Sequence, residues 1–341
     1  MRTFQPSHLD PLPVKRALPR RFRLPRLLLA GCGDVAERMA QQLNAHGERY
    51  RLRALLRHAP DSATWARWRA LGTTPINADL DQARSLHRLL GIADQVVYLA
   101  PPAEAAGQRS VDGRLNRLLA ALHAGRSLSR PAGRPIVKRF VLVGTTGVYG
   151  DRAGAFTPET TPCRPQSARG QRRLLAEQTL GHWRRSRSRA GLAAHRATRQ
   201  TGGILRVPGI YAAERLPVER LRAGTPAINA DEDSWTNHIH ADDLARICWL
   251  ALVRSGNLRA INTTDHSQIK MGDWFDAVAD ATGLARPERL PREQIKARVS
   301  PMLYSFMSES RRLDNTRLTR ELRVRLTYPT VHDFLATLKP L

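Results

Sequence analysis

A glycine-rich turn near the start of the sequence constrains the fold more than any other feature. Residues 31–36 read Gly-Cys-Gly-Asp-Val-Ala, between an apolar run, Leu27–Ala30, and a segment, Val35–His46, with apolar residues at helical spacing. Two glycines between a strand and a helix allow a tight turn and let a phosphate approach the helix N-terminus. Because ordinary strand-to-helix turns can share this pattern, its context decides its meaning.

That context is a regular alternation of short apolar runs with helical patterns, which is typical of βαβ units and a parallel sheet. Strands are expected at Leu27–Ala30, Leu52–Leu56, Thr74–Asn77, Gln95–Leu99, Arg139–Val143 and Gly203–Val207. The sequence therefore predicts an α/β fold with a doubly wound parallel sheet of the Rossmann type. A dinucleotide, NAD or NADP, is the ligand expected at the glycine turn.

The chain divides into three expected regions. Residues 1–25 form a basic, proline-rich extension that we expect to be disordered. Residues 26–210 form the dinucleotide-binding domain. Residues 211–341 have a looser pattern, with a helix expected at Ala241–Val253, a strand at Ala260–Thr263, a helix at Met271–Thr282 and a mainly helical tail over Pro301–Leu341. We expect this C-terminal region to be a smaller substrate lobe that is not autonomous.

Composition excludes several other classes of protein. No apolar run reaches the 18 residues of a membrane-spanning helix. The basic N-terminus lacks the apolar stretch of a secretory signal, although a transit peptide stays an alternative. Three cysteines, Cys32, Cys163 and Cys248, are far apart and odd in number, so we expect neither a disulfide framework nor a metal site, and we expect a cytoplasmic protein.

The formal net charge of +25 suits a polyanionic partner such as nucleic acid. The cations concentrate in the N-terminal arm and in the segment His182–Arg199. Both clusters lack the interleaved aromatic residues of a single-strand binding surface, and no helix-turn-helix or zinc-finger spacing occurs. A solvated, arginine-rich surface explains the charge equally well. Nucleic acid is therefore an alternative partner, and a small molecule is the expected one.

Five further segments occur in a fixed order along the chain. They are Ala78–Leu80, Leu99–Pro102, Phe140–Asp151 with its Val-Tyr-Gly ending, Leu205–Tyr211 and Asn237–Ala245 with its His-x-Asp-Asp-Leu-Ala ending. Together with the glycine turn they resemble the extended short-chain dehydrogenase/reductase group, of the nucleotide-sugar epimerase/dehydratase type, over roughly Arg26 to Leu341. The resemblance implies an NAD(P) cofactor, a small-molecule substrate and the possibility of a homodimer.

The resemblance and the glycine turn together define a cofactor site. Its residues are Gly31, Cys32, Gly33, Asp34, Val35, Arg57, Asp79, Leu80, Ala100, Pro101, Arg173 and Pro208. Arg57 ends the second strand, and no acid follows before Asp61. An acid there would bind the ribose 2′-hydroxyl, whereas an arginine accommodates a 2′-phosphate. This favours NADP over NAD, with a plain surface role for Arg57 as the alternative.

The catalytic pattern that the resemblance implies is incomplete. The family uses a Ser or Thr after the fifth strand and a Tyr-x-x-x-Lys on the next helix, where the lysine lowers the pKa of the tyrosine for proton transfer. Thr145 fills the first position. Counting back from Glu177, Arg173 takes the lysine position and Arg169 the tyrosine position. An arginine stays protonated and cannot transfer the proton, but it can bind a phosphate or carboxylate.

Two functions therefore stay open. The chain is either an NAD(P)-dependent oxidoreductase or epimerase acting on an anionic or sugar-like small molecule, or an NAD(P)-binding sensor or scaffold that has lost the proton relay. Tyr149 and Tyr211 are the candidate replacement acids. Glu159 matches an acidic loop position of the family, and a metal site at His238 and His240 is a weak candidate.

Overall fold

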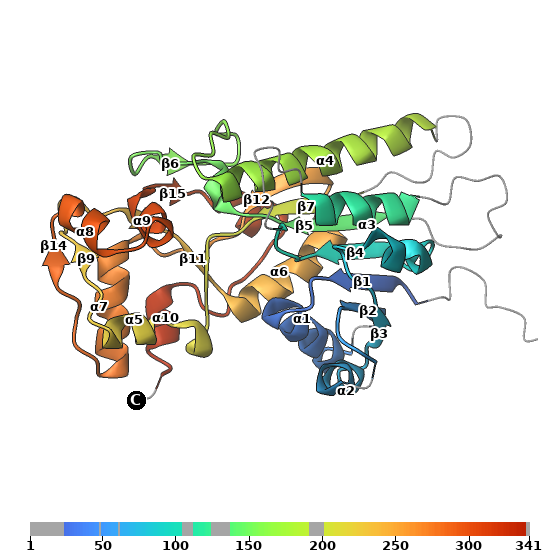
Figure 1. Cartoon of the computed structure of the whole chain (residues 1–341), viewed down its shortest axis with the longest axis horizontal. Coiled ribbons are helices and arrows are strands. Elements are labelled where there is room, and N and C mark those ends of the chain that lie inside the picture. The colour runs from blue at the N-terminus through green and yellow to red at the C-terminus, as the bar shows by residue number, and fades with distance from the viewer. Residues whose placement is uncertain are drawn as a thin grey trace, which may run out of the picture.

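The computed structural model describes residues 24–47, 49–60, 62–103, 112–123, 137–190 and 201–338. Two lobes are visible in Figure 1: a sheet with helices on both faces, and a smaller lobe of short helices and strands beyond the carboxyl ends of the sheet strands. The expected N-terminal extension lies outside the described residues except for its last two. No helix within the described ranges is long and apolar enough to cross a membrane.

The central sheet has seven parallel strands in the order β12-β7-β5-β4-β1-β2-β3. Their bounds are β1 Arg26–Ala30, β2 Arg51–Leu56, β3 Thr74–Asn77, β4 Gln95–Tyr98, β5 Arg139–Val143, β7 Gly202–Arg206 and β12 Asn257–Asn262. The chain runs outward from β1 in one direction to β3 and then returns to β4 on the other side of β1. This reversal creates a crevice at the carboxyl ends of β1 and β4, where open α/β sheets bind ligands. The predicted Rossmann-type sheet is confirmed.

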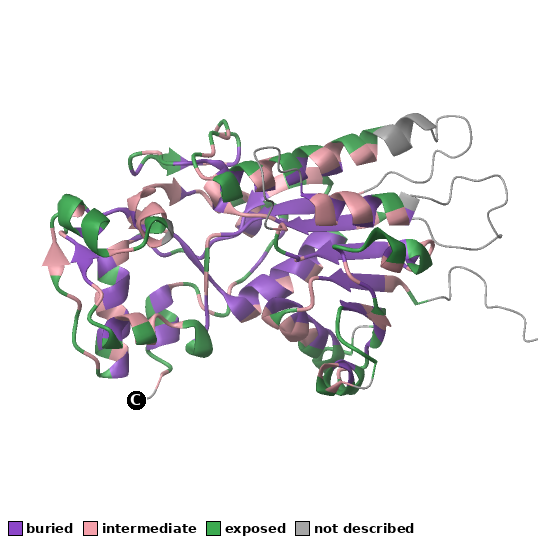
Figure 2. Cartoon of the chain, in the orientation of Figure 1, coloured by how far each residue is buried: buried purple, intermediate pink, exposed green. Residues whose placement is uncertain are grey.

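Alternation along the strands explains why helices cover both faces. Leu27 and Leu29 of β1 face one apolar cluster, and Leu28 and Ala30 face another. The first cluster includes apolar residues of α1 (Asp34–Ala45), α2 (Ala63–Ala70) and α6 (Ala241–Arg254), and the second includes those of α3 (Gly113–His123) and α4 (Ala168–Ala190). Figure 2 shows the buried residues gathered in the strands and on the inner helix faces.

Between β3 and β4 the chain forms a 3-10 helix, η2 (Ala83–Leu89). The tail is less helical than expected. It holds α9 (Pro301–Ser308), a single π-helical turn, η5 (Arg317–Glu321), and α10 (Val331–Leu335), but also a short strand, β15 (Arg312–Leu313). β15 pairs with β6 (Phe156–Thr157), far away in the sequence. Pairing of two residues with a distant segment leaves no period in the local sequence, so pattern reasoning misses it.

The smaller lobe is built on short helices around two apolar clusters, one that includes Trp274, Phe275 and Phe334 and a smaller one of Ile228, Ile295 and Met307. It contains α5 (Val218–Arg222), α7 (Met271–Thr282), α8 (Arg292–Arg298) and the strand pair β9 (Ala227–Ile228) and β14 (Arg289–Leu290). Two further strand pairs connect it to the sheet domain: β8 (Gly209–Tyr211) with β11 (His238–His240), and β10 (Trp235–Thr236) with β13 (Ile269–Lys270).

The chain crosses between the two lobes more than once. After β11 it returns to the sheet as α6 and β12, so the sheet extends past the boundary that we expected at residue 210. Asp243, a buried residue of α6, then fixes the tail: its carboxylate accepts the backbone N–H groups of Thr327 at 2.8 Å and Tyr328 at 3.0 Å. Asp243, the second acid of the motif that resembled a family signature, thus forms a tertiary contact between α6 and residues 327 and 328.

Candidate active site

The glycine turn brings the ends of β1 and β4 into close contact. Gly31 has a φ of +102°, and a Cβ added there would lie 2.2 Å from the backbone nitrogen of Ala100, so only glycine fits. Gly33 precedes α1 as its N-cap, and no side chain caps this helix end. A Cβ added at Gly33 would meet no atom within 4 Å. The N-terminus of α1 therefore faces open space, as phosphate binding requires.

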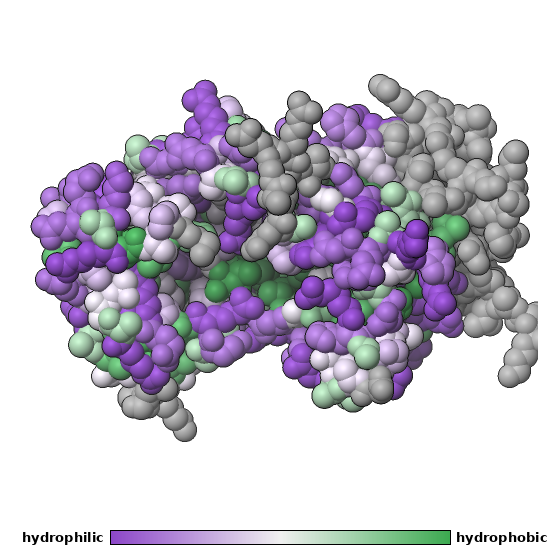
Figure 3. Space-filling view, viewed as in Figure 1, coloured by the Kyte–Doolittle hydropathy of each residue, from purple (hydrophilic) through white to green (hydrophobic). Residues whose placement is uncertain are grey.

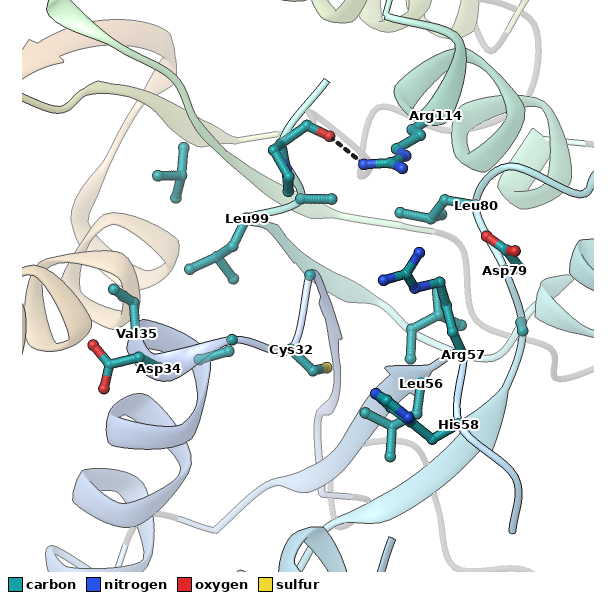
Figure 4. Close-up of a pocket in the computed structure, with 18 of the residues that line it drawn as sticks. Cys32, Asp34, Val35, Leu56, Arg57, His58, Asp79, Leu80, Leu99 and Arg114 are labelled. Carbon is teal, nitrogen blue, oxygen red and sulfur yellow. Dashed lines mark hydrogen bonds between the residues drawn. The ribbon is translucent and has the colours of Figure 1, made fainter. Parts of the chain in front are cut away.

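A cavity of about 410 Å³ lies over this turn (Figure 4). Most of the predicted cofactor residues line it. They are Gly31, Cys32, Gly33, Asp34, Val35, Arg57, Asp79, Leu80, Ala100 and Pro101. These residues follow β1, β2, β3 and β4 directly, and Asp34 and Val35 begin α1; they meet because parallel strands present their carboxyl ends at one edge of the sheet.

The far end of this first cavity is polar and basic. Arg57 and His58 follow β2, and Figure 4 shows Arg57 on the same side as Asp79 and Leu80, away from Asp34. Arg114 of α3 also lines it and donates to the backbone oxygen of Pro101 at 3.0 Å. Asp61, the first acid after β2 in the sequence, lies outside the described residues.

Cys32 lines the first cavity but is no nucleophile. Its sulfur lies 3.4 Å from the backbone oxygen of Leu29, and burial raises the pKa of the thiol to about 12. A thiol with that pKa carries almost no thiolate at neutral pH. Cys32 therefore acts as a small, apolar spacer between the two glycines.

Arg173 lies directly behind the cavity wall. It is buried in α4, and its Nη1 donates to the backbone oxygen of Ala100 at 3.2 Å, while its Nε has no hydrogen-bond partner. Burial lowers the pKa of Arg173, although the nearby charge of Asp112 opposes that shift. A buried guanidinium with an unpartnered N–H next to Ala100 has donor capacity left for a group in the cofactor cavity.

A second cavity, of about 570 Å³, adjoins the first and shares Ile210 and Arg215 with it. The sheet domain supplies Thr145, Arg169 and Pro208 to its lining, and the smaller lobe supplies Trp235, Met271 and Phe306. Figure 3 shows hydrophobic residues in a hollow between the two lobes, surrounded by hydrophilic ones. The hydroxyl of Thr145 accepts the backbone N–H of Gly147 at 3.3 Å, which fixes its orientation at the end of β5.

The structure corrects the assignment of Tyr149 and Tyr211 as replacement acids, because neither residue lines either cavity. Tyr149 is fully buried: its hydroxyl donates to Asn262 at 2.7 Å and accepts from Arg206 at 2.9 Å. The hydroxyl of Tyr211 donates to Asp265 at 3.2 Å. Burial raises the pKa of both hydroxyl groups. Both tyrosines are core residues whose hydroxyl groups are already satisfied.

Glu159 is likewise a core residue, because its carboxylate accepts the backbone N–H of Asn262 at 3.0 Å. His240 caps α6 by accepting the N–H of Asp242 at 3.2 Å, whereas His238 lines the second cavity. Burial lowers the pKa of His238 to about 3, so its ring is neutral. Among the residues that the structure describes, no group of three or more His, Cys, Asp or Glu side chains could hold a metal ion.

Sequence reasoning missed several lining residues. Arg215, Phe306, Glu309 and Arg311 line the second cavity, and all but Arg215 come from the tail of the chain. Trp235 of β10 lines the same cavity. These residues follow no motif, and only the folding of the tail onto the sheet domain brings them to the cavity. The basic segment His182–Arg199 begins in the last turns of α4, and its second half, residues 191–199, lies outside the described residues.

Comparison with known proteins places this arrangement in a family. Residues 28–263 match the family model described as the NAD dependent epimerase/dehydratase family. The chain belongs to this family. No curated protein matches the sequence at a significant level.

Solved structures of family type share the fold over almost the whole chain. A functionally unknown conserved protein from Silicibacter pomeroyi DSS is 26% identical, with a TM-score of 0.68, and the match covers 91% of this chain and 96% of that one. UDP-glucose 4-epimerase from Thermotoga maritima, solved with UDP-glucose, is 17% identical with a TM-score of 0.65 over 91% and 96% of the two chains. UDP-glucuronic acid 4-epimerase from Bacillus cereus, in complex with NAD, is 18% identical with a TM-score of 0.65 over 91% and 94%.

Proposed function

We propose that this chain is an NAD(P)-dependent enzyme of the epimerase/dehydratase family that binds NADP in the first cavity and a small-molecule substrate in the second. The observation that carries the proposal is the junction of the two cavities. Val143 at the end of β5 lines the first cavity and Thr145, two residues later, lines the second. A ligand in one cavity can therefore touch a ligand in the other. The nicotinamide cofactor supplies hydride transfer when bound.

Each residue of the site has a role that its position allows. The backbone at Gly33 and the free N-terminus of α1 suit a pyrophosphate. Arg173 lines neither cavity, and its hydrogen bond to the backbone oxygen of Ala100 suits it to hold the cavity wall beside the cofactor ribose. Thr145 suits a substrate oxygen. Arg169 cannot transfer a proton, but its permanent charge stabilises negative charge on a substrate oxygen.

Arg57 supports the preference for NADP, because its guanidinium lines the end of the first cavity where β2 ends. The test is a titration of the native protein and the Arg57→Ala variant with NADPH and NADH, followed by cofactor fluorescence. Since a charge-assisted hydrogen bond contributes about 1.5–3 kcal/mol, NADPH affinity should fall about 10- to 100-fold while NADH affinity stays within about twofold.

The control is Arg51→Ala, which removes an exposed arginine at the opposite end of the same strand. This variant should bind both cofactors as the native protein does. Equal losses for NADPH and NADH in Arg57→Ala would contradict the assignment of Arg57. Failure of the native protein to bind either cofactor would refute the proposed function itself.

One observation favours the alternative, a cofactor-binding sensor without turnover. Within the described part of the chain no tyrosine lines either cavity, and Arg169 stands at the position of the family's tyrosine. A sensor would gain stability with NADPH but would not oxidise it. Two assays separate the functions. Net loss of NADPH absorbance with aldehydes or ketones would show an oxidoreductase, and conversion of a nucleotide sugar followed by chromatography would show an epimerase or dehydratase, which regenerates its cofactor within each turnover. A sensor would give neither signal.

A further inference from the structure

The second cavity carries an excess of positive charge. Three arginines, Arg169, Arg215 and Arg311, line it together with one acid, Glu309. Two of the arginines are paired within the protein. Arg215 forms an ion pair with Asp34 at 3.0 Å, and Arg311 donates to Glu309 at 2.8 Å. Arg169, the second residue of α4, is the remaining cation.

Arg169 has no carboxylate partner among the residues described. Its guanidinium lies over the ring of Phe306, 5.9 Å from the ring centre, instead of pairing with an acid. Phe306 is a large apolar residue that is 52% exposed, so the pair lies at the wall of an open cavity. The aromatic face holds the guanidinium in place at low cost and leaves its N–H donors for another group.

A second, independent feature of the cavity lacks a partner. His238 is 94% buried, its neutral ring lines the cavity, and its Nε2 has no hydrogen-bond partner. Its other ring nitrogen, Nδ1, lies beside the exposed residue Gly209, where an added Cβ would come within 3.2 Å. Gly209 lines the same cavity, so the Nδ1 side of the ring lies at the cavity wall. Buried polar groups are nearly always satisfied, so a ring whose Nε2 has no partner in the protein has hydrogen-bonding capacity left.

We propose that the second cavity binds a small organic anion, whose charged group pairs with Arg169 and whose body lies against Phe306 and Trp235. His238 would contact a polar atom of the same molecule. The inference rests on the proposed function, because it names the substrate class of that site. It also explains what Arg169 does at a position where proton transfer is impossible: it anchors the substrate beside Thr145, next to the cofactor cavity.

The test uses the full-length protein with and without saturating NADPH. The probes are benzoate, its uncharged counterpart benzamide, acetate and inorganic phosphate, and binding is followed by ligand-observed NMR at fixed ionic strength. Benzoate and benzamide have nearly the same shape, so their comparison isolates the charge. Acetate isolates the carboxylate from the aromatic body, and phosphate distinguishes a phosphate-bearing substrate from a carboxylate.

The variants are Arg169→Gln, Phe306→Leu and, as matched control, Arg185→Gln. Arg185 is an exposed arginine on the same helix that lines a separate surface pocket. We expect the favoured anion to bind about tenfold or more tightly than benzamide, and Arg169→Gln to remove that advantage. Phe306→Leu should lower the affinity for benzoate more than the affinity for acetate. Arg185→Gln should change neither affinity by more than about twofold.

The inference is overturned if benzoate and benzamide bind equally, if Arg169→Gln keeps the native affinity, if Arg185→Gln loses as much as Arg169→Gln, or if no anion of the panel binds. NADPH affinity is a separate readout in the same samples. If Arg169→Gln binds both NADPH and the anion as tightly as the native protein does, the proposed substrate class is refuted and the proposed cofactor binding is not. Absence of NADPH binding in the native protein would refute the proposed function, and the anion series in the apo protein would still test Arg169.

Discussion

The buried ion pair between Glu177 and Arg206 offers the sharpest test of how the sheet is held against α4. Arg206, the last residue of β7, donates two hydrogen bonds to the Glu177 carboxylate, at 3.1 and 2.8 Å, and both side chains are more than nine-tenths buried. Burial works against the charge of Arg206, but the hydrogen bonds and charge of Glu177 outweigh it and raise its pKa. The change Glu177→Gln keeps the shape and removes the charge.

The expected cost follows from the burial. Breaking a buried pair from one side costs about 3–5 kcal/mol, since the remaining charge loses its partner but cannot reach water. Arg206 would keep only neutral partners, such as the hydroxyl of Tyr149 at 2.9 Å. With an unfolding entropy of about 2.1 cal/mol/K per residue, a chain of 341 residues should melt about 4–7 °C lower for that loss.

Thermal unfolding followed by circular dichroism, with urea unfolding as a second measurement, checks this prediction. The control is Glu219→Gln, which breaks an exposed pair with Arg222 and should lower the melting temperature by about 1 °C or less. The double variant Glu177→Leu, Arg206→Met should recover much of the loss, because an apolar pair of similar volume has no charge to desolvate. A shift below about 1 °C for Glu177→Gln would refute the reasoning.

Two further predictions concern a buried carboxyl and the glycine turn. Burial raises the pKa of Asp265 to about 7, so its protonated form stabilises the fold; this contribution is complete below about pH 4 and is lost as the pH rises through about 7. The urea concentration at the midpoint of unfolding should therefore decrease as the pH of the native protein is raised from 5 to 8. Asp265→Asn should flatten this part of the pH profile, and an unchanged profile would contradict the assignment. At the turn, Gly31→Ala should destabilise the fold, because its Cβ would collide with Ala100, whereas Gly33→Ala should leave the melting temperature within about 1 °C and weaken NADPH binding at least about tenfold. If Gly33→Ala binds NADPH as the native protein does, the pyrophosphate does not lie against the glycine turn.

The sheet was predictable because its strands are buried on both faces. Continuous apolar runs reveal the inner strands directly, and the expected bounds of β5 agree with the structure residue for residue. The bounds of β3 also agree, although this edge strand is partly exposed. Likewise the helix expected at Met271–Thr282 is α7, which ends at Gly283 in the left-handed conformation, φ +70°.

The second cavity was harder to predict, because its lining depends on pairing between distant segments. β8 and β11 have three residues each and no periodic pattern, yet their pairing places His238 beside Gly209. Tyr149 shows the opposite failure. Its place in a family motif suggested a role as a catalytic acid. Its hydroxyl is instead buried and donates a hydrogen bond to the carboxamide of Asn262, more than a hundred residues later in the sequence. Sequence spacing cannot show such a partner.

The contacts of Asp243 with Thr327 and Tyr328 have a consequence for how the chain is made. The edge strand β12 and the helix α6 belong to the sheet domain. The buried carboxylate of Asp243 on α6 nevertheless accepts its hydrogen bonds from residues 327 and 328. A ribosome synthesising this protein releases the glycine turn long before Thr327 and Tyr328, so in that interval the Asp243 carboxylate lacks the two backbone donors that satisfy it in the folded chain. The hydrogen bonds that α6 makes in the folded protein are therefore complete only after residues 327 and 328 have emerged.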